Sequence, residues 1–287
     1  MLTGARLTGP MRLIDVHFQG RERVIGTWQV GDVLIDPGPE TASATLIEAL
    51  NGEAPRALLL THIHLDHAGA AGAIVRRWPE VVVYVHERGA RHLMDPSKLL
   101  ASAERLYGDE MQRLWGDVVP VPRERLRPLA GGETLEGFRV AYTPGHASHH
   151  VSYLHEDSGR AFVGDVAGVR IVGSDLVLTP TPPPDIDLEA WNASLSLVAE
   201  WKPESLGLTH FGSVDEPYAQ LAAVRDCLVA WATLARELDA SAFEAHIREQ
   251  VAAAVDPDTA AAYLLAVPPE QQWYGLDRYW RKREQGS

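Results

Sequence analysis

Cysteine is almost absent from the sequence, since Cys227 is the only one in 287 residues. A single thiol excludes an intramolecular disulfide framework. Long apolar segments are missing too, and residues 1–12 show neither the hydrophobic run of a signal peptide nor a transmembrane helix. With 46% hydrophobic residues, the chain can still bury a large core. We therefore expect a soluble cytoplasmic protein of one domain, or of one domain with an extension, and no membrane partner.

Basic residues are outnumbered. The chain has 26 Lys and Arg residues against 39 Asp and Glu residues, which gives a formal net charge of −13 and a pI near 5.3. A nucleic acid would need a basic track along its backbone. The one basic cluster, residues 278–283, is interpreted as the solvated end of a helix. The charge therefore argues against a nucleic-acid partner and favours a small-molecule substrate.

Four residues that commonly bind metals follow directly on an apolar run at residues 57–60. The run predicts a buried strand, and if the chain stays extended beyond it, His62, His64 and Asp66 point to the same side. The small residues that come next predict a helix start, which would turn Asp66 and His67 toward a second point. A lone histidine after a strand is usually a loop residue, but a buried loop would lose about 1 kcal/mol for each of four unpaired groups. The cluster therefore predicts a metal site.

Further ligands must come from elsewhere in the chain. His146, Asp165 and His210 each lie beside a turn that follows an apolar segment. A Pro-Gly turn, for example, holds His146 at the end of a predicted strand. Each of the three is a weak candidate alone, because a single His or Asp at a strand end is more often structural. Together with the cluster they fit one pattern.

The spacing His-x-His-x-Asp-His at residues 62–67, followed by His146, Asp165 and His210, resembles the signature of the metallo-β-lactamase superfamily. The resemblance extends from about Thr27 to His210. It implies an α/β fold, namely a four-layer αββα sandwich of two mixed sheets with the metals at one edge. Composition and periodicity alone indicate only mixed α and β structure. The domain of this fold would comprise residues 1–213, with a helical insertion at about 88–127 and a C-terminal helical extension at 214–287.

The resemblance also assigns seven residues to two metal ions. It further implies that Asp36, in a strand-then-Asp-x-Gly turn, orients a ligand, and that His150 supports the site. The other histidines, among them His86 and His149, are interpreted as hydrogen-bonded core or rim residues. By the resemblance, His62, His64 and His146 hold the first ion, Asp66, His67 and His210 hold the second, and Asp165 bridges them.

The β-lactamases proper differ from this chain in their ligands. They commonly use a cysteine and lack the bridging aspartate, whereas Cys227 lies in a helical stretch beyond the last candidate ligand. Antibiotic hydrolysis is therefore not expected. The site is more similar to those of glyoxalase II, lactonases and phosphodiesterases.

The implied activity is that of a metal-dependent hydrolase with two divalent metal ions per chain. Zinc is the leading metal, and manganese or iron also suit His and Asp ligands. A hydroxide that bridges the ions would attack a small ester, thioester or lactone, with Asp66 or Asp165 as the proton relay. Three alternatives stay open: a phosphodiesterase, a mononuclear iron oxidoreductase of the persulfide dioxygenase type, and a metal-binding protein without turnover. RNA processing is disfavoured, because the tRNA-processing relatives typically have Gly where this chain has Leu65.

Residues 88–127 depart from strand patterning, and an apolar stripe recurs there at helical spacing. The stripe either packs on the core, forms a lid over the pocket, or provides a contact in a homodimer. The prolines of residues 179–187 exclude a long regular element, and Asp187 is predicted to cap a helix from Leu188. Beyond His210 the pattern predicts helix to the end. The stripe comprises Leu99, Leu100, Ala103, Leu106, Tyr107, Met111, Leu114 and Trp115.

Overall fold

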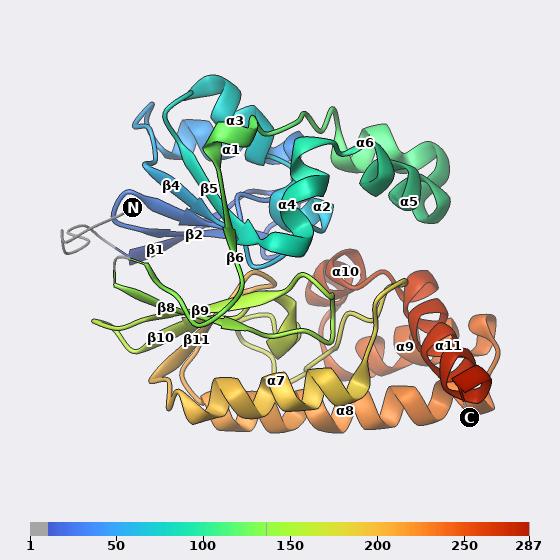
Figure 1. Cartoon of the computed structure of the whole chain (residues 1–287). Coiled ribbons are helices and arrows are strands. Elements are labelled where there is room, and N and C mark those ends of the chain that lie inside the picture. Colours follow the sequence, from blue (N-terminus) through green and yellow to red (C-terminus); the bar gives the residue numbers. More distant parts are fainter. Residues whose placement is uncertain (1–10, 136, 287) are drawn as a thin grey trace.

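Short runs rich in Val, Ile and Leu form two six-stranded sheets in the computed structural model, which describes residues 11–135 and 137–286 (Figure 1). In the first sheet the strands lie in chain order, antiparallel from β1 to β3 and parallel from β3 to β6. In the second sheet the order is β12-β11-β10-β9-β8-β7, and only β10 and β11 are parallel. The first sheet contains β1 (Met11–Asp15), β2 (Gly26–Val30), β3 (Val33–Ile35), β4 (Ala57–Leu59), β5 (Val82–His86) and β6 (Leu126–Leu129). The second contains β7 (Thr134–Leu135), β8 (Phe138–Tyr142), β9 (Val151–His155), β10 (Arg160–Phe162), β11 (Ser205–Leu208) and β12 (Gly212–Val214).

The two sheets pack face to face through a layer of large buried side chains. Trp28 of β2 meets Phe162 of β10 edge-on, with ring centroids 5.5 Å apart. Its indole N–H donates to the carbonyl oxygen of Leu208 at 3.0 Å, and the Tyr153 hydroxyl donates to that of Leu60 at 2.8 Å. The buried N–H and O–H groups of these aromatic residues thus donate hydrogen bonds to the opposite sheet. These bonds hold together the strand ends that carry the candidate metal ligands.

Helices cover the outer faces of both sheets (Figure 1). The helices α1 and α3 lie on the first sheet, and α7 and α8 lie on the second. This arrangement is the αββα sandwich that the resemblance implies, and that prediction is confirmed. The bounds are α1 (Ser43–Ala49), α2 (Leu65–Ala68), α3 (Ala71–Arg77), α7 (Leu188–Glu200) and α8 (Pro217–Glu237), with the 3-10 turns η1 (Phe18–Gly20), η2 (Glu40–Ala42) and η5 (Gly164–Ala167).

The segment predicted to be a helical insertion contains three α-helices between β5 and β6. Within it, Ala103 and Trp115 are buried, and the Trp115 ring stacks on Phe18 with centroids 5.5 Å apart. The apolar stripe therefore packs on the sandwich along part of its length. The elements are α4 (Glu87–Met94), α5 (Ser97–Tyr107), η3 (Gly108–Glu110), α6 (Met111–Trp115) and η4 (Arg123–Arg125).

The last part of the chain is helical from Pro217 onward, and its helices share one continuous buried cluster with the sandwich. The prediction of helix throughout the region beyond His210 is wrong for β12, which pairs antiparallel with β11. Its three residues carry too little periodicity to reveal a strand, and pairing with the edge of β11 decides their conformation. None of the described helices combines the length and hydropathy needed to cross a membrane. Residues 1–10, on which the expectation of no signal peptide mostly rests, lie outside the described residues. The remaining helices are α9 (Ala240–Ala254), α10 (Pro257–Ala266) and α11 (Pro269–Gly286).

The helix α7 fixes the turn that carries His146. As predicted, Asp187 caps the helix and accepts the N–H of Ala190 at 2.9 Å. The Asp187 N–H donates to the carbonyl oxygen of Gly145 at 2.9 Å, and the Trp191 ring packs edge-on against His146 with centroids 5.5 Å apart. Gly145 has φ of 136°, and a Cβ added there would lie 2.3 Å from Cα of Trp191. Only glycine fits between the turn and the helix.

Replacing Gly145 with Ala should therefore lower the free energy of unfolding by about 3 kcal/mol or more, because the strained backbone and the contact with the Trp191 backbone add. The matched control is Gly132→Ala, at φ of 95° with no atom within 4 Å of the added Cβ. It should cost only about 1 to 2 kcal/mol. Chemical denaturation of both variants measures the difference, and equal losses would show that the Trp191 contact contributes nothing.

Candidate metal centre

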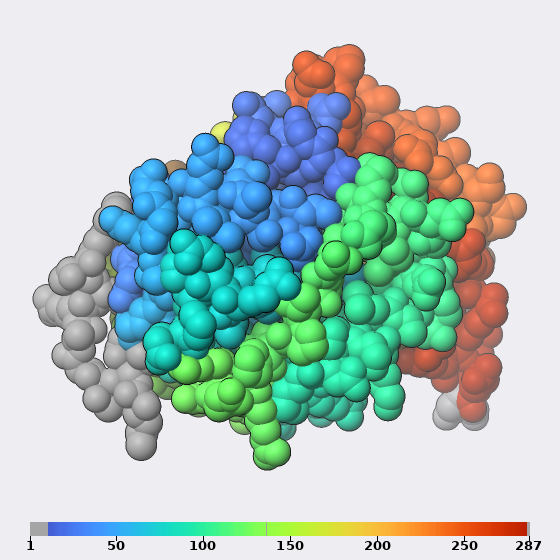
Figure 2. Space-filling model, turned by 90° about the horizontal axis from the view of Figure 1, so that it is seen from above, coloured from blue at the N-terminus to red at the C-terminus, as the bar shows by residue number. Residues whose placement is uncertain are grey.

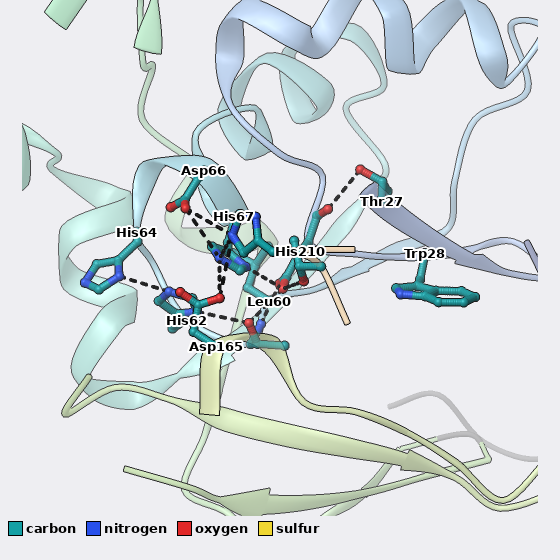
Figure 3. A network of polar contacts seen from close by, with 12 residues as sticks. Thr27, Trp28, Leu60, His62, His64, Asp66, His67, Asp165 and His210 are labelled. Carbon is teal, nitrogen blue, oxygen red and sulfur yellow. Dashed lines mark hydrogen bonds and ion pairs between the residues drawn. The ribbon is translucent and has the colours of Figure 1, made fainter. Parts of the chain in front are cut away.

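The first group of donors comes from the loop after β4 and from the turn after β8. The loop carries His62 and His64 (Figure 3). The turn carries His146. Nδ1 of His64 lies 3.0 Å from Nε2 of His62 and 2.9 Å from Nε2 of His146. Three ring nitrogens from segments more than eighty residues apart thus converge on one point.

The second group lies beside the first. Asp66 and His67 occupy the first turn of α2, which begins at Leu65, slightly earlier than the composition predicts. His210 follows β11, and its Nε2 lies 3.3 Å from Nε2 of His67 and 3.3 Å from Oδ2 of Asp66. These three side chains therefore converge on a second point.

Asp165, in η5 after β10, stands between the two groups (Figure 3). Its Oδ1 lies 3.1 Å from Nε2 of His67, and its Oδ2 lies 3.4 Å from Nε2 of His146. One oxygen thus faces each group, so that Asp165 belongs to both. The structure brings all seven predicted residues together, in the grouping that the resemblance implies; their role as ligands stays a prediction.

A buried carboxylate behind the site sets the proton positions of two rings. Asp36 is fully buried, and its Oδ2 accepts from Nδ1 of His67 at 2.8 Å, from the Thr61 hydroxyl at 2.7 Å and from the Thr209 hydroxyl at 3.1 Å. Because the Thr61 hydroxyl gives its only proton to Asp36, it must accept from Nδ1 of His62, which lies 3.0 Å away. The predicted orienting role of Asp36 thus has a geometric basis, and it reaches both groups.

Backbone carbonyl groups orient two more rings in the same way. Nδ1 of His146 donates to the carbonyl oxygen of Pro180 at 2.8 Å, and Nδ1 of His210 donates to that of Val24 at 2.7 Å. A carbonyl oxygen can only accept, so each Nδ1 carries the proton, and Nε2 of the neutral ring presents a lone pair to the centre. Four imidazoles are therefore held in the tautomer that a metal ligand requires.

The donors fit a pair of metal ions. Nitrogen ligands about 2.1 Å from a tetrahedral ion lie about 3.4 Å apart. The nearest donor atoms in the two groups are separated by 2.9 to 3.7 Å, and all donor atoms of a group lie within 4.8 Å of one another. Oδ1 of Asp165 is buried, and within residues 11–135 and 137–286 it has no hydrogen-bond partner. In the first group, whose three rings have a lowered pKa and stay neutral, lone pairs that face one another at these distances repel, and a bound cation converts the repulsion into attraction. The residues therefore could hold divalent metal ions.

Burial and charge act differently on the two groups. Burial lowers the pKa of His62 well below its usual value and that of His64 to about 4, so that both rings stay neutral. Burial also opposes charge on His67, but Asp165, Asp66 and Asp36 outweigh it and raise the pKa of that ring. Burial would raise the pKa of Asp66, but His67 and His210 lower it to about 2. A metal ion entering the second group therefore displaces a proton, and metal binding there strengthens as pH rises.

Three other histidines lie near the site. His150 is buried behind His62, with ring centroids 5.1 Å apart, and its Nδ1 lies 2.9 Å from the Thr143 hydroxyl. His86 accepts the N–H of Arg88 at 3.3 Å, as the interpretation of a hydrogen-bonded residue predicts. For His149 the expected hydrogen bond is missing at Nδ1, which is buried without a partner among the described residues, while its ring lies at the rim of the cavity beside His64. In the sequence, the clustering of three histidines within residues 146–150 could have indicated that His149 lies close to the site.

A cavity of about 1160 Å³ opens from the metal centre. Asp66, with 21% of its side chain exposed, and His64 border it, so that a bound substrate would reach both groups. The walls come from α4 to α6, from the proline-rich segment, and from α10 and α11. In Figure 2 the green helices of the insertion border the orange and red C-terminal helices. Two segments far apart in sequence therefore enclose the space in front of the metal centre.

Comparison with known proteins agrees with this geometry. The family model described as metallo-beta-lactamase superfamily matches residues 31–210. The metallo-beta-lactamase fold-containing protein ST1585 of Sulfurisphaera tokodaii is 34% identical over 164 residues, which cover 55% of this chain and 60% of that protein. Its crystal structure superposes with a TM-score of 0.70 at 24% identity and covers 96% of this chain and 99% of that chain. That likeness shows the fold.

Two further relatives carry more specific descriptions. A hydroxyacylglutathione hydrolase of Legionella pneumophila is 25% identical over 135 residues, which cover 46% of this chain and 41% of the enzyme. The crystal structure of TTHA1623 in a di-iron-bound form is 27% identical, with a TM-score of 0.51, and covers 77% of this chain and 96% of that chain. The sequence matches thus span less than two thirds of the ST1585 protein and of the hydrolase.

Replacing Asp36 with Asn should weaken metal binding about 10- to 100-fold, because an amide has only one acceptor oxygen. In the carboxylate, Oδ2 accepts from His67 and the two threonine hydroxyls, while Oδ1 accepts from the N–H of Thr61. Competition with a chromophoric chelator measures the affinity. The control is Asp239→Asn, since Asp239 caps α9 through the N–H of Ala242 and asparagine caps equally well. An Asp36→Asn protein that is less stable but binds metal normally would show that Asp36 only supports packing.

Proposed function

The chain belongs to the metallo-β-lactamase superfamily, and from this membership we propose that it is a metal-dependent hydrolase that holds two divalent cations and cleaves a small ester, thioester or lactone. The observation that carries the proposal is the pair of convergent donor groups that share Asp165. Zinc is the first metal to test. Iron is included because the related structure of TTHA1623 is di-iron-bound, and manganese because carboxylate and imidazole ligands suit it.

Bound metal ions would supply a hydroxide at neutral pH and polarise the carbonyl group of the substrate. The side chains orient the ligands and transfer the proton. The rings of His62, His67, His146 and His210 are held by their Nδ1 protons, so that no reorientation is needed during the reaction. Asp66 is the carboxylate that borders the cavity with the larger exposed fraction, 21% against 4% for Asp165. In this proposal Asp66 takes the proton that the metal-bound water loses and returns it to the leaving group.

The description of one relative supports a thioester among these substrates. Hydroxyacylglutathione, the substrate named for the enzyme of Legionella pneumophila, is a thioester. The candidate ligands are imidazoles and carboxylates, with no thiolate. Such a site suits thioester hydrolysis and ester or lactone hydrolysis equally. The oxidative alternative differs in using one iron ion and oxygen, so that it can be separated by experiment.

The test is a panel of thioesters, esters, lactones, phosphodiesters and glutathione persulfide, assayed with zinc-, manganese- and iron-loaded protein while oxygen uptake is followed. We expect close to two metal ions per chain by plasma emission and turnover of a carboxylic thioester, ester or lactone. Replacing Asp165 with Ala should lower the metal content and reduce turnover more than about 100-fold, because the residue faces both groups. Oxygen consumption with the persulfide and no ester turnover would refute the proposal.

The apolar wall of the cavity offers a test of how the substrate is selected. Six of the eight residues in the predicted stripe line the cavity, which favours the lid interpretation for part of it. Leu106 lines the cavity but is not packed against the core, whereas Leu100, on the same helix, packs against the core and does not line the cavity. The two leucines therefore separate a role in substrate binding from a role in stability.

Replacing Leu106 with Ala should lower kcat/KM for substrates with an apolar acyl chain about 3- to 10-fold relative to acetyl substrates, because apolar contact with the chain is lost. Leu100→Ala should instead lower the free energy of unfolding by about 1 to 2 kcal/mol and leave the ratio unchanged. If both variants change stability alone, the stripe is core packing and the lid interpretation fails.

A further inference from the structure

One wall of the cavity carries three cations beside the carboxylates of Glu87 and Asp185, although the chain carries a net charge of −13. We call it the basic wall. Arg88 and Arg91 lie three residues apart on α4, which places them on one face of the helix, and Lys98 follows at the start of α5. All three are exposed and line the cavity. Among the residues that the structure describes, no carboxylate lies within 4.0 Å of their charged groups. By contrast, Arg113, farther along the wall, pairs with Glu110.

The basic wall is attached to the first group of donors. Gly89, between the two arginines, approaches the metal motif so closely that an added Cβ would lie 2.8 Å from Cγ2 of Ile63 and 3.7 Å from Cβ of His149. The guanidinium of Arg88 lies 5.6 Å from the centre of the Tyr142 ring, whose hydroxyl donates to the carbonyl oxygen of Ser148 at 2.9 Å. The cations therefore sit next to the segment that carries His146.

The apolar wall lies on the side of the second group. Ile25 and Phe18 line the cavity there, and the preceding residue, Val24, accepts the hydrogen bond of His210. Trp115 stacks on Phe18 and extends this wall. Lys98 and Leu106 stand at opposite ends of α5, about 12 Å apart along the helix axis at 1.5 Å per residue. A ligand that touches both walls must be elongated, with an anionic end and an apolar end.

The balance of charge favours such a ligand. Two divalent cations and one bound hydroxide would change the net charge of the lining from −1 to +2, counted on Asp, Glu, Lys and Arg. A positive cavity in an acidic protein attracts anions and repels cations. The lining contains five basic residues, Arg88, Arg91, Lys98, Arg105 and Arg113, and six acidic residues, Asp66, Glu87, Glu110, Asp165, Asp185 and Glu270.

We infer that the substrate is an acyl thioester with an anionic leaving group, bound so that the leaving group contacts Arg88, Arg91 and Lys98 while the acyl chain lies along the apolar wall. The inference rests on the proposed function and specifies its substrate. Hydrolysis adds the hydroxyl of water to the acyl carbon, breaks the C–S bond, and leaves the remaining proton with the thiol. The anionic group could be a phosphate or a carboxylate, since both accept hydrogen bonds from guanidinium and ammonium groups.

Binding is measured without turnover by calorimetry with three thioether analogues that share a hexyl chain. S-hexyl coenzyme A carries phosphates, S-hexyl glutathione carries carboxylates, and S-hexyl-N-acetylcysteamine is neutral. We expect the zinc-loaded protein to bind at least one anionic analogue more tightly than the neutral one, with an affinity that falls as salt is added. The preferred analogue identifies the anion as phosphate or carboxylate.

The double variant Arg88→Gln/Arg91→Gln should weaken binding of that analogue about tenfold and leave the neutral analogue unchanged. Lys98→Met provides an independent variant on a different helix and should act in the same direction. The control, Arg76→Gln/Arg123→Gln, removes the same two charges from exposed positions that do not line the cavity. It should bind all analogues normally.

Equal binding of charged and neutral analogues, or equal losses in the double variant and the control, would overturn the inference. Measurements of turnover then distinguish a failure of the anion site from a failure of the proposed hydrolase function. If neutral and anionic thioesters are hydrolysed at the same rate, the proposed function stands and the basic wall has no role in it. If no ester is hydrolysed but the anionic analogue binds through Arg88 and Arg91, the anion site stands and the proposed function fails.

Discussion

The buried carboxylate of Asp36 connects three segments on which the candidate metal centre depends. It accepts hydrogen bonds from the hydroxyl of Thr61 after β4, from Nδ1 of His67 in α2 and from the hydroxyl of Thr209 after β11. The N–H of Thr61 adds a fourth hydrogen bond at 2.8 Å. An unpaired carboxylate at this depth would cost several kcal/mol, so the three segments are held at the distances that satisfy it. Through Thr61 the same carboxylate also orients His62, and both donor groups share one anchor.

Strand direction explains why these segments meet. The parallel strands β3 and β4 end at the same edge of their sheet, which brings Asp36 beside the metal motif. Backbone hydrogen bonds then join the sheets at this edge: the N–H of Val151 donates to the carbonyl oxygen of Thr61 at 2.7 Å, and that of Gly26 donates to Thr209 at 2.9 Å. The centre is thus built where backbone hydrogen bonds join the two sheets, so that ligands can be held without large fluctuations.

The chemistry and the choice of substrate reside in different parts of the chain. Donor side chains lie at strand ends of the sandwich, whereas the cavity walls come from the insertion and from the C-terminal helices. A fold alone does not determine a substrate, so relatives with the same centre can differ where these helices differ. The basic wall near His64 comes from α4 and α5, whereas Phe18 and Ile25 of the sandwich contribute to the apolar wall near His210 together with the insertion.

The sequence by itself determined the local parts of the site. The spacing of His62, His64, Asp66 and His67 after an apolar run, and the position of three later candidates at strand ends, depend on alternation and turn chemistry that neighbouring residues encode. Comparison with a known family added the grouping of the donors and the role of Asp36. Only the tertiary structure decided which nitrogen of each ring faces the centre, because the acceptors of the Nδ1 protons include Pro180 and Val24, which are distant in sequence. It also placed His149 in the cavity wall and formed β12, since contacts between segments far apart in the chain leave no periodic trace in either one.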